Sequence, residues 1–244
     1  MMARKNEARM TARMLAEELR SVFGDGLRAV ALYGSAVGEG DTARAADMHI
    51  LVIVRELPLD LLAEAGRHVT AWLEGGHPPP LVLTEAEWSA SSDIFPMEYA
   101  DILDSRVELA GRVPVDGLAV APMELRMAAE REGMGKLLQF RRAVIAVGDD
   151  AAQRTELLAA SLPTFLAVFR GGLRVLGIHP EADPAGTCRE IGYRAGVDMA
   201  PFARVIEHRR GSNPIAPGEV TGVLAGYLEG VEKVVAWLDQ LTPP

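Results

Sequence analysis

Hydrophobic positions divide the chain into a first part with strand-like runs and a second part without them. In the first part, short apolar runs at 27–33, 48–54 and 81–84 are bounded by Gly, Pro or polar residues, which is typical of β-strands. The run at 48–54 is nearly continuous and predicts a central strand buried on both faces. A fourth strand is expected at 95–103, where the alternation of apolar and polar residues is imperfect.

Helical spacing in the same part predicts helices between these strands. Apolar residues recur at helical intervals over 3–22, and a second helix is expected over 58–74, with Pro58 in its first turn. Residues 85–93 are expected to form a short helix or a loop. The first part of the chain is therefore predicted to be α/β (α+β), with a mixed sheet flanked by helices.

Beyond about Pro122 the strand-like runs end and helical periodicity dominates. A break is possible at Gly133 or Gly135, and Pro163 predicts a kink or an interruption of its helix. The boundary falls near 118–122, which predicts two domains, 1–120 and 121–244, the second an all-α helical bundle. The expected helices of the second domain span 123–147, 151–176, 187–195, 200–209 and 217–241.

Composition narrows the classes of function. The net charge is −9, from 34 acidic and 25 basic residues, so nucleic acid is not favoured as the main partner. Cys188 is the single cysteine, which excludes an internal disulfide. The N-terminus lacks the apolar core of a signal peptide, and no apolar run approaches the roughly 20 residues that span a bilayer. We therefore expect a cytoplasmic protein without a membrane partner.

The candidate chemistry lies between the first two predicted strands. Gly34 and Ser35 follow the first strand, and a glycine there lets the backbone approach a ligand closely. If Ser35 opens a helix, its hydroxyl and the backbone N–H groups of the first turn suit a phosphate. Asp47 enters the next strand, where its carboxylate would hold a divalent cation beside that phosphate.

This stretch resembles the nucleotidyltransferase superfamily of the polymerase-β-like fold, which includes aminoglycoside adenylyltransferases. The family pattern is a hydrophobic strand, Gly-Ser, a Gly-containing loop, and Asp-x-Asp or Asp-x-Glu entering a strand. The segment 93–102 also resembles bacterial nucleotidyltransferase-domain proteins that carry Phe-Pro-x-Glu before a helical C-terminal part. The resemblance implies Mg²⁺ with ATP or another nucleoside triphosphate, and transfer of a nucleoside monophosphate to an acceptor.

The resemblance assigns roles by position. Gly34 and Ser35 match the phosphate-binding pair, and Asp47 matches the first metal carboxylate. His49 stands where the second metal carboxylate belongs. The third carboxylate is expected on the strand around 97–101, where Glu98 and Asp101 are both candidates.

His49 is the departure from the pattern. Mg²⁺ prefers oxygen ligands, and neutral imidazole lacks the negative charge of a carboxylate. Three interpretations follow: a catalytically dead site that still binds nucleotide, a weak site with one metal, or a position that has lost its ligand. We favour the first and third, in which His49 is a buried histidine with its hydrogen bonds satisfied.

The predicted function is thus a nucleotidyltransferase-like protein whose transfer activity is weak or lost, with an unknown small-molecule or protein acceptor. The first alternative is a non-catalytic nucleotide-binding or protein-interaction module, similar to an antitoxin. The second alternative is an aminoglycoside adenylyltransferase. Arg170 and Arg174, one helical turn apart, are candidates to hold a triphosphate, although such pairs are more often solvated. A homodimer is a possible assembly.

Overall fold

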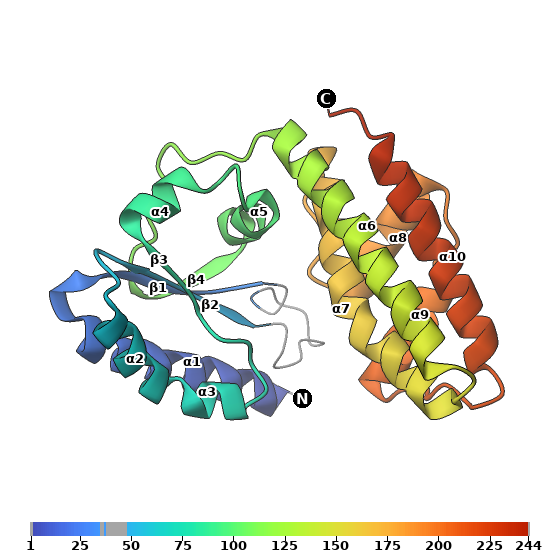
Figure 1. Cartoon of the computed structure of the whole chain (residues 1–244), viewed down its shortest axis with the longest axis horizontal. Coiled ribbons are helices and arrows are strands. Elements are labelled where there is room, and N and C mark those ends of the chain that lie inside the picture. Colours follow the sequence, from blue (N-terminus) through green and yellow to red (C-terminus); the bar gives the residue numbers. More distant parts are fainter. Residues whose placement is uncertain (1, 35–36, 38–47, 244) are drawn as a thin grey trace. The chain divides into compact units, whose positions relative to one another are not determined.

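A computed structural model describes residues 2–34, 37 and 48–243 of the chain (Figure 1). The described residues belong to two compact units, Met1–Val120 and Ala121–Pro244. We refer to these as the N-terminal unit and the helical unit, and describe each by itself.

The N-terminal unit is built on a four-stranded mixed sheet. Its strands are β1 (Leu27–Tyr33), β2 (His49–Val54), β3 (Leu81–Thr84) and β4 (Arg106–Gly111), in the spatial order β3-β2-β1-β4. Strand β1 is antiparallel to β2 and β4, whereas β2 and β3 are parallel. The predicted mixed sheet flanked by helices is confirmed, and the apolar runs at 27–33 and 81–84 are the strands β1 and β3.

Helices cover both faces of this sheet (Figure 1). Helices α1 (Met2–Phe23), α2 (Leu59–His68) and α3 (Thr70–Glu74) lie on one side, and α4 (Glu85–Ala90) and α5 (Pro96–Asp104) lie on the other. The alternation along β1 explains the two cores. Val30 and Leu32 pack with residues of α1, whereas Ala31 and Tyr33 pack with residues of α4 and α5.

The strand expected at 95–103 is wrong, because this segment forms helix α5. Pro96 occupies the first turn, where its missing N–H costs nothing, and Glu98 adds a negative charge near the helix N-terminus. Tyr99 and Ile102 are buried on the side that faces the sheet. The fourth strand is instead β4, a half-buried edge strand whose short polar-apolar sequence gave no clear signal.

Helices α4 and α5 are fixed to the sheet and to each other by a few specific contacts. Thr84 caps α4 by accepting a hydrogen bond from the N–H of Glu87, and Glu87 accepts one from the N–H of Thr84 in return. The rings of Trp88 and Tyr99 stack 4.3 Å apart, and the Tyr99 hydroxyl donates to the carbonyl of Trp88 at 2.7 Å. These contacts hold α5 over β1.

The helical unit consists, in the part that the structure describes, of α6 to α10, as the periodicity predicts. Helix α6 runs unbroken through Gly133 and Gly135. Gly133 allows close packing, since a Cβ there would lie 3.2 Å from Val168 and 3.3 Å from Val235. The helices are α6 (Pro122–Val147), α7 (Ala151–Val175), α8 (Pro184–Ala195), α9 (Ala200–Arg210) and α10 (Val220–Asp239).

Helix α7 is the core helix of this unit. It is long and apolar enough to meet the criteria for a membrane span, but 56% of the apolar window is buried inside the protein, as expected for a core helix. The helix continues through Pro163, although proline cannot donate to the carbonyl of Ala159. The guanidinium of Arg209 donates to that carbonyl instead, at 2.6 Å.

Candidate functional site

The end of β1 carries the first element of the candidate site. Gly34 has a φ of 99°, a conformation that residues with a Cβ rarely adopt. The N–H of Val37 donates to the carbonyl of Gly34 at 3.1 Å, directly after the strand. The glycine of the predicted Gly-Ser pair therefore lies where a backbone without a side chain is needed.

Tyr33 and His49 form the second element. The two residues are cross-strand partners in the β1–β2 pair, and their rings lie 5.3 Å apart at an interplanar angle of 32°. Tyr33 is 7% exposed. The imidazole at the expected second ligand position therefore packs against an aromatic ring at the start of β2.

Two carboxylates on α5 form the third element. Glu98 and Asp101 are three residues apart and lie on one side of the helix. Burial raises the pKa of the Tyr33 hydroxyl, and the nearby charges of Glu98 and then Asp101 raise it further. Tyr33 packs in one core cluster with Tyr99 and Ile102 of α5, which places the carboxylates of the same helix in its neighbourhood. We call Tyr33, Gly34, His49, Glu98 and Asp101 the β1-end cluster.

Arg106 links the C-terminal turn of α5 to the sheet beside Tyr33. It is the cross-strand partner of Tyr33 in the β1–β4 pair. Its guanidinium donates to the carbonyls of Ile102 and Leu103 at 3.3 and 3.4 Å, which are acceptors in the last turn of α5. The first residue of β4 thus holds the helix that carries both carboxylates.

The structure describes only some of the site residues that the sequence predicts. Ser35 and Asp47 lie outside the described residues, so their roles stay predictions. Glu98 and Asp101 were expected on a strand, and the structure places them on a helix facing the end of β1. Within 2–34, 37 and 48–243, no group of three or more His, Cys, Asp or Glu side chains is arranged to hold a metal ion.

Sequence reasoning did not single out Tyr33 or Arg106 as site residues. Tyr33 directly precedes Gly34, and the alternation along β1 places it on the face opposite Leu32, which was a usable signal. Arg106 was missed because the sequence pattern predicted the fourth strand at 95–103, whereas Arg106 begins the strand β4 that the structure shows. Arg170 is 9% exposed in the helical unit. Burial raises the pKa of Cys188, and the charge of Arg170 lowers it by less. The suggested contact of Arg170 with a phosphate is not tested by these observations and stays a prediction.

The β1-end cluster supplies only part of what a magnesium centre needs. Mg²⁺ takes oxygen ligands in near-octahedral geometry. Glu98 and Asp101 supply carboxylate oxygens, but His49 supplies nitrogen and contacts Tyr33, and these side chains do not converge as a metal-binding group. The described residues therefore do not by themselves fit a magnesium site.

Comparison with known proteins gives the fold. No protein-family model and no curated protein matches the chain. Among solved structures, it is similar to spectinomycin adenyltransferase AAD(9) from Enterococcus faecialis, a structure determined with ATP and spectinomycin. The match has a TM-score of 0.50 at 12% sequence identity and covers 95% of this chain and 97% of the other. The N-terminal unit, followed by helices, therefore has the nucleotidyltransferase fold.

Proposed function

We propose that the protein binds a nucleoside triphosphate at the end of β1 and that its nucleotidyl-transfer activity is weak or lost. The phosphates would meet the backbone at Gly34, whose positive φ and missing side chain suit close approach. Ser35 and Asp47 would extend this site. ATP or another nucleoside triphosphate would bring Mg²⁺ with its own phosphates.

The observation that carries the loss of activity is the contact between His49 and Tyr33. An imidazole occupies the position of a metal carboxylate, and its ring packs on a tyrosine ring 5.3 Å away. An imidazole in this place contributes no negative charge toward a cation. Glu98 and Asp101 remain able to accept a proton from an acceptor hydroxyl, so the proposed defect lies in holding the metal and not in the supply of a base.

Binding and turnover can be measured separately. Calorimetric titration of the full chain with ATP and Mg²⁺ should show binding, and an assay of pyrophosphate release should show little or none above background. Strong release with an acceptor would overturn the proposed loss of activity. Absence of ATP binding would overturn the proposal itself and favour a protein-interaction module, similar to an antitoxin.

A second candidate function follows from the structural neighbour. AAD(9) is named for spectinomycin adenylylation, and its likeness extends over nearly the whole of both chains. Two neighbouring carboxylates, Glu98 and Asp101, would suit an acceptor that carries amino groups. Expression in a sensitive bacterium should decide the matter: increased resistance to spectinomycin or an aminoglycoside supports this candidate, and unchanged sensitivity excludes it. Either function places the protein in the cytoplasm, where ATP is found.

A further inference from the structure

Helix α6 carries an exposed line of large apolar side chains. We call these residues the α6 stripe, and each is between 46% and 81% exposed. Successive members are 4, 7, 4 and 7 residues apart, an 11-residue repeat that is typical of right-handed coiled coils. At 3.6 residues per turn they fall within an arc of about 60°. The stripe consists of Met123, Met127, Met134, Leu138 and Ile145.

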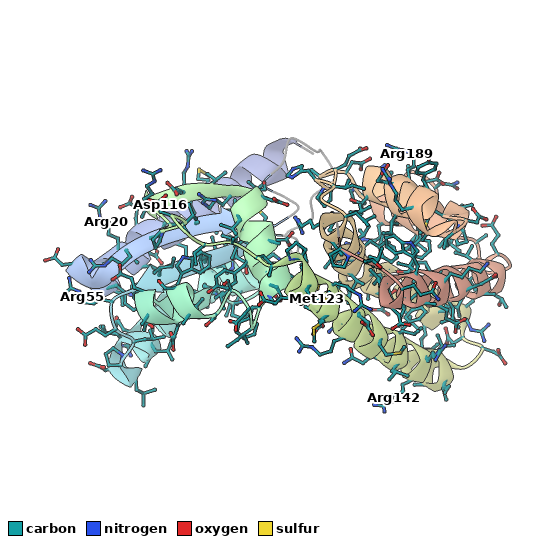
Figure 2. All side chains as sticks on the ribbon, turned by 90° about the horizontal axis from the view of Figure 1, so that it is seen from above. Arg20, Arg55, Asp116, Met123, Arg142 and Arg189 are labelled. Carbon is teal, nitrogen blue, oxygen red and sulfur yellow. The ribbon has the colours of Figure 1, made fainter. Side chains whose placement is uncertain are left out.

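The stripe does not serve the core of the helical unit. Helix α6 packs on α7 and α10 with its other side, where Phe140 contacts the rings of Phe165 and Tyr227. Figure 2 shows Arg142 extending from the outer edge of α6, away from the other helices of this unit. An apolar seam of this length on the outside of a helix is the kind of surface that a partner covers.

Charged residues beside the stripe indicate which partner fits. Glu124 and Arg142 are 18 residues apart, which is five full turns, so both flank the same side of the stripe near its opposite ends. Glu130 and Arg141 form ion pairs within the chain, with Arg126 and Glu232, so they do not indicate a partner. In the pair that flanks the stripe, the acid, Glu124, lies toward the N-terminus of α6 and the base, Arg142, toward its C-terminus.

We propose that α6 pairs antiparallel with α6 of a second copy of this chain, forming a twofold-symmetric homodimer along the α6 stripe. The symmetry axis would pass near Met134, which lies midway between Met123 and Ile145. Such an axis places Glu124 of one chain beside Arg142 of the other, twice per dimer. In a parallel pair Glu124 and Arg142 would lie about 27 Å apart along the helices and could not meet, so this charge pair favours the antiparallel arrangement.

The same geometry sets the strength of the dimer. A single-helix seam buries less than the about 800 Å² per partner of standard interfaces. The methionines adapt to a partner surface without requiring exact complementarity. Arg131 lies near the centre of the seam, where the axis would bring it close to its own copy. We therefore expect a reversible dimer with a dissociation constant of about 1–100 μM.

Sedimentation equilibrium of the full chain over a range of concentrations tests the dimer. Wild type should show a monomer–dimer equilibrium, and Met134→Glu, which sets two carboxylates against each other at the axis, should be monomeric. Tyr193→Glu is the matched control, because Tyr193 is 80% exposed on α8 outside the stripe. Leu138→Glu serves as a second variant if Met134→Glu fails to fold. A wild type that is monomeric throughout, or a dimer unaffected by both stripe variants, would overturn the proposal.

Charge reversal tests the antiparallel arrangement. Glu124→Arg and Arg142→Glu should each weaken the dimer about tenfold, and the double variant should restore it. Five turns separate the two residues within one chain, so the rescue can arise only between chains. Lack of rescue would contradict the antiparallel pairing. Arg131→Gln should tighten the dimer by removing the like charges near the axis. None of these outcomes depends on nucleotide binding.

Discussion

The imidazole of His49 lies against the phenol ring of Tyr33, with the ring centroids 5.3 Å apart. The two residues face each other across the central strands β1 and β2, at the end of β1 that precedes Gly34. Tyr33 in turn experiences the charges of Glu98 and Asp101 from α5. At the position where the sequence pattern expects a metal carboxylate, a histidine therefore packs on the tyrosine that the carboxylates of α5 approach.

The first prediction is that His49→Asp raises pyrophosphate release from ATP in the presence of Mg²⁺. The new carboxylate would supply the missing charged oxygen ligand next to Asp47. His49→Asn is the matched control, because it removes the ring and has a similar size but no charge. A gain of at least about tenfold for Asp and not for Asn would correspond to about 1.4 kcal/mol of barrier. Equal rates for both variants would contradict a decayed metal site.

Gly34 provides the second prediction. Gly34→Ala forces a Cβ into a conformation with a φ of 99°, so we expect it to cost about 1–3 kcal/mol of stability. It should also weaken ATP binding, because the backbone can no longer approach the phosphates. Gly66→Ala in α2 is the control. A Cβ at position 66 would meet nothing within 4 Å, and this change should stabilise the protein by about 0.5–1 kcal/mol. Unchanged affinity in a folded Gly34→Ala protein would remove Gly34 from the site.

Tyr99 gives a prediction about pH. Burial raises the pKa of Tyr99 to about 12, whereas an unfolded tyrosine titrates near 10. Between these values the unfolded chain loses the proton first, so stability falls as the pH rises above about 10. In Tyr99→Phe this alkaline loss should be smaller. At neutral pH the variant should be less stable by about 1 kcal/mol, because the hydrogen bond to Trp88 is lost.

Urea unfolding of both proteins at several pH values measures this difference. Tyr193→Phe is the control, since its side chain is 80% exposed and contributes little to the core. Tyr33 and Tyr227 also have raised pKa values through burial, so Tyr99→Phe should reduce the alkaline loss without abolishing it. Identical slopes for wild type and Tyr99→Phe would contradict the prediction.

The extent to which the fold is predictable from sequence depends on burial. Residues 48–54 are recognisable as a strand because both faces of β2 are covered, so nearly every position is apolar. β4 is an edge strand with half-buried and exposed positions, and its pattern is weak. In α5, Pro96 suggests an edge strand, although proline equally suits the first helical turn. Local pattern does not separate these two uses.

The candidate site is predictable only in part, for a similar reason. Gly34 is recognisable because its position after a strand implies a special backbone conformation, and its φ of 99° agrees. The approach of Glu98 and Asp101 to Tyr33 depends on how α5 packs, through the stacking of Tyr99 on Trp88. That packing joins distant parts of the chain, and no local spacing encodes it.

Cys188 should be unreactive in the native protein. Burial raises the pKa of its thiol to about 12, and the charge of Arg170 acts in the opposite direction with a smaller effect. Iodoacetamide at pH 8 should therefore label the unfolded chain in urea but leave the folded chain unmodified, as read by intact mass. Cys188→Ala controls for labelling at other residues. Rapid labelling of the folded protein would contradict a buried thiol.

The last prediction concerns Pro163 and Arg209. Proline leaves the carbonyl of Ala159 without its helical donor, and the guanidinium of Arg209 donates to it at 2.6 Å. Arg209→Met should therefore destabilise the protein by about 1–3 kcal/mol. In a Pro163→Ala background the new backbone N–H can donate to the same carbonyl, so Arg209→Met should cost less there.

Urea unfolding of the four proteins gives this coupling as a double-mutant cycle. The cycle separates the shared carbonyl from the other contacts of Arg209, because those contacts are lost equally in both backgrounds. Arg189→Met, at an exposed arginine of α8, should show no coupling to Pro163. An equal cost of Arg209→Met in both backgrounds would mean that the guanidinium does not replace the missing donor, and that α7 accommodates Pro163 by other means.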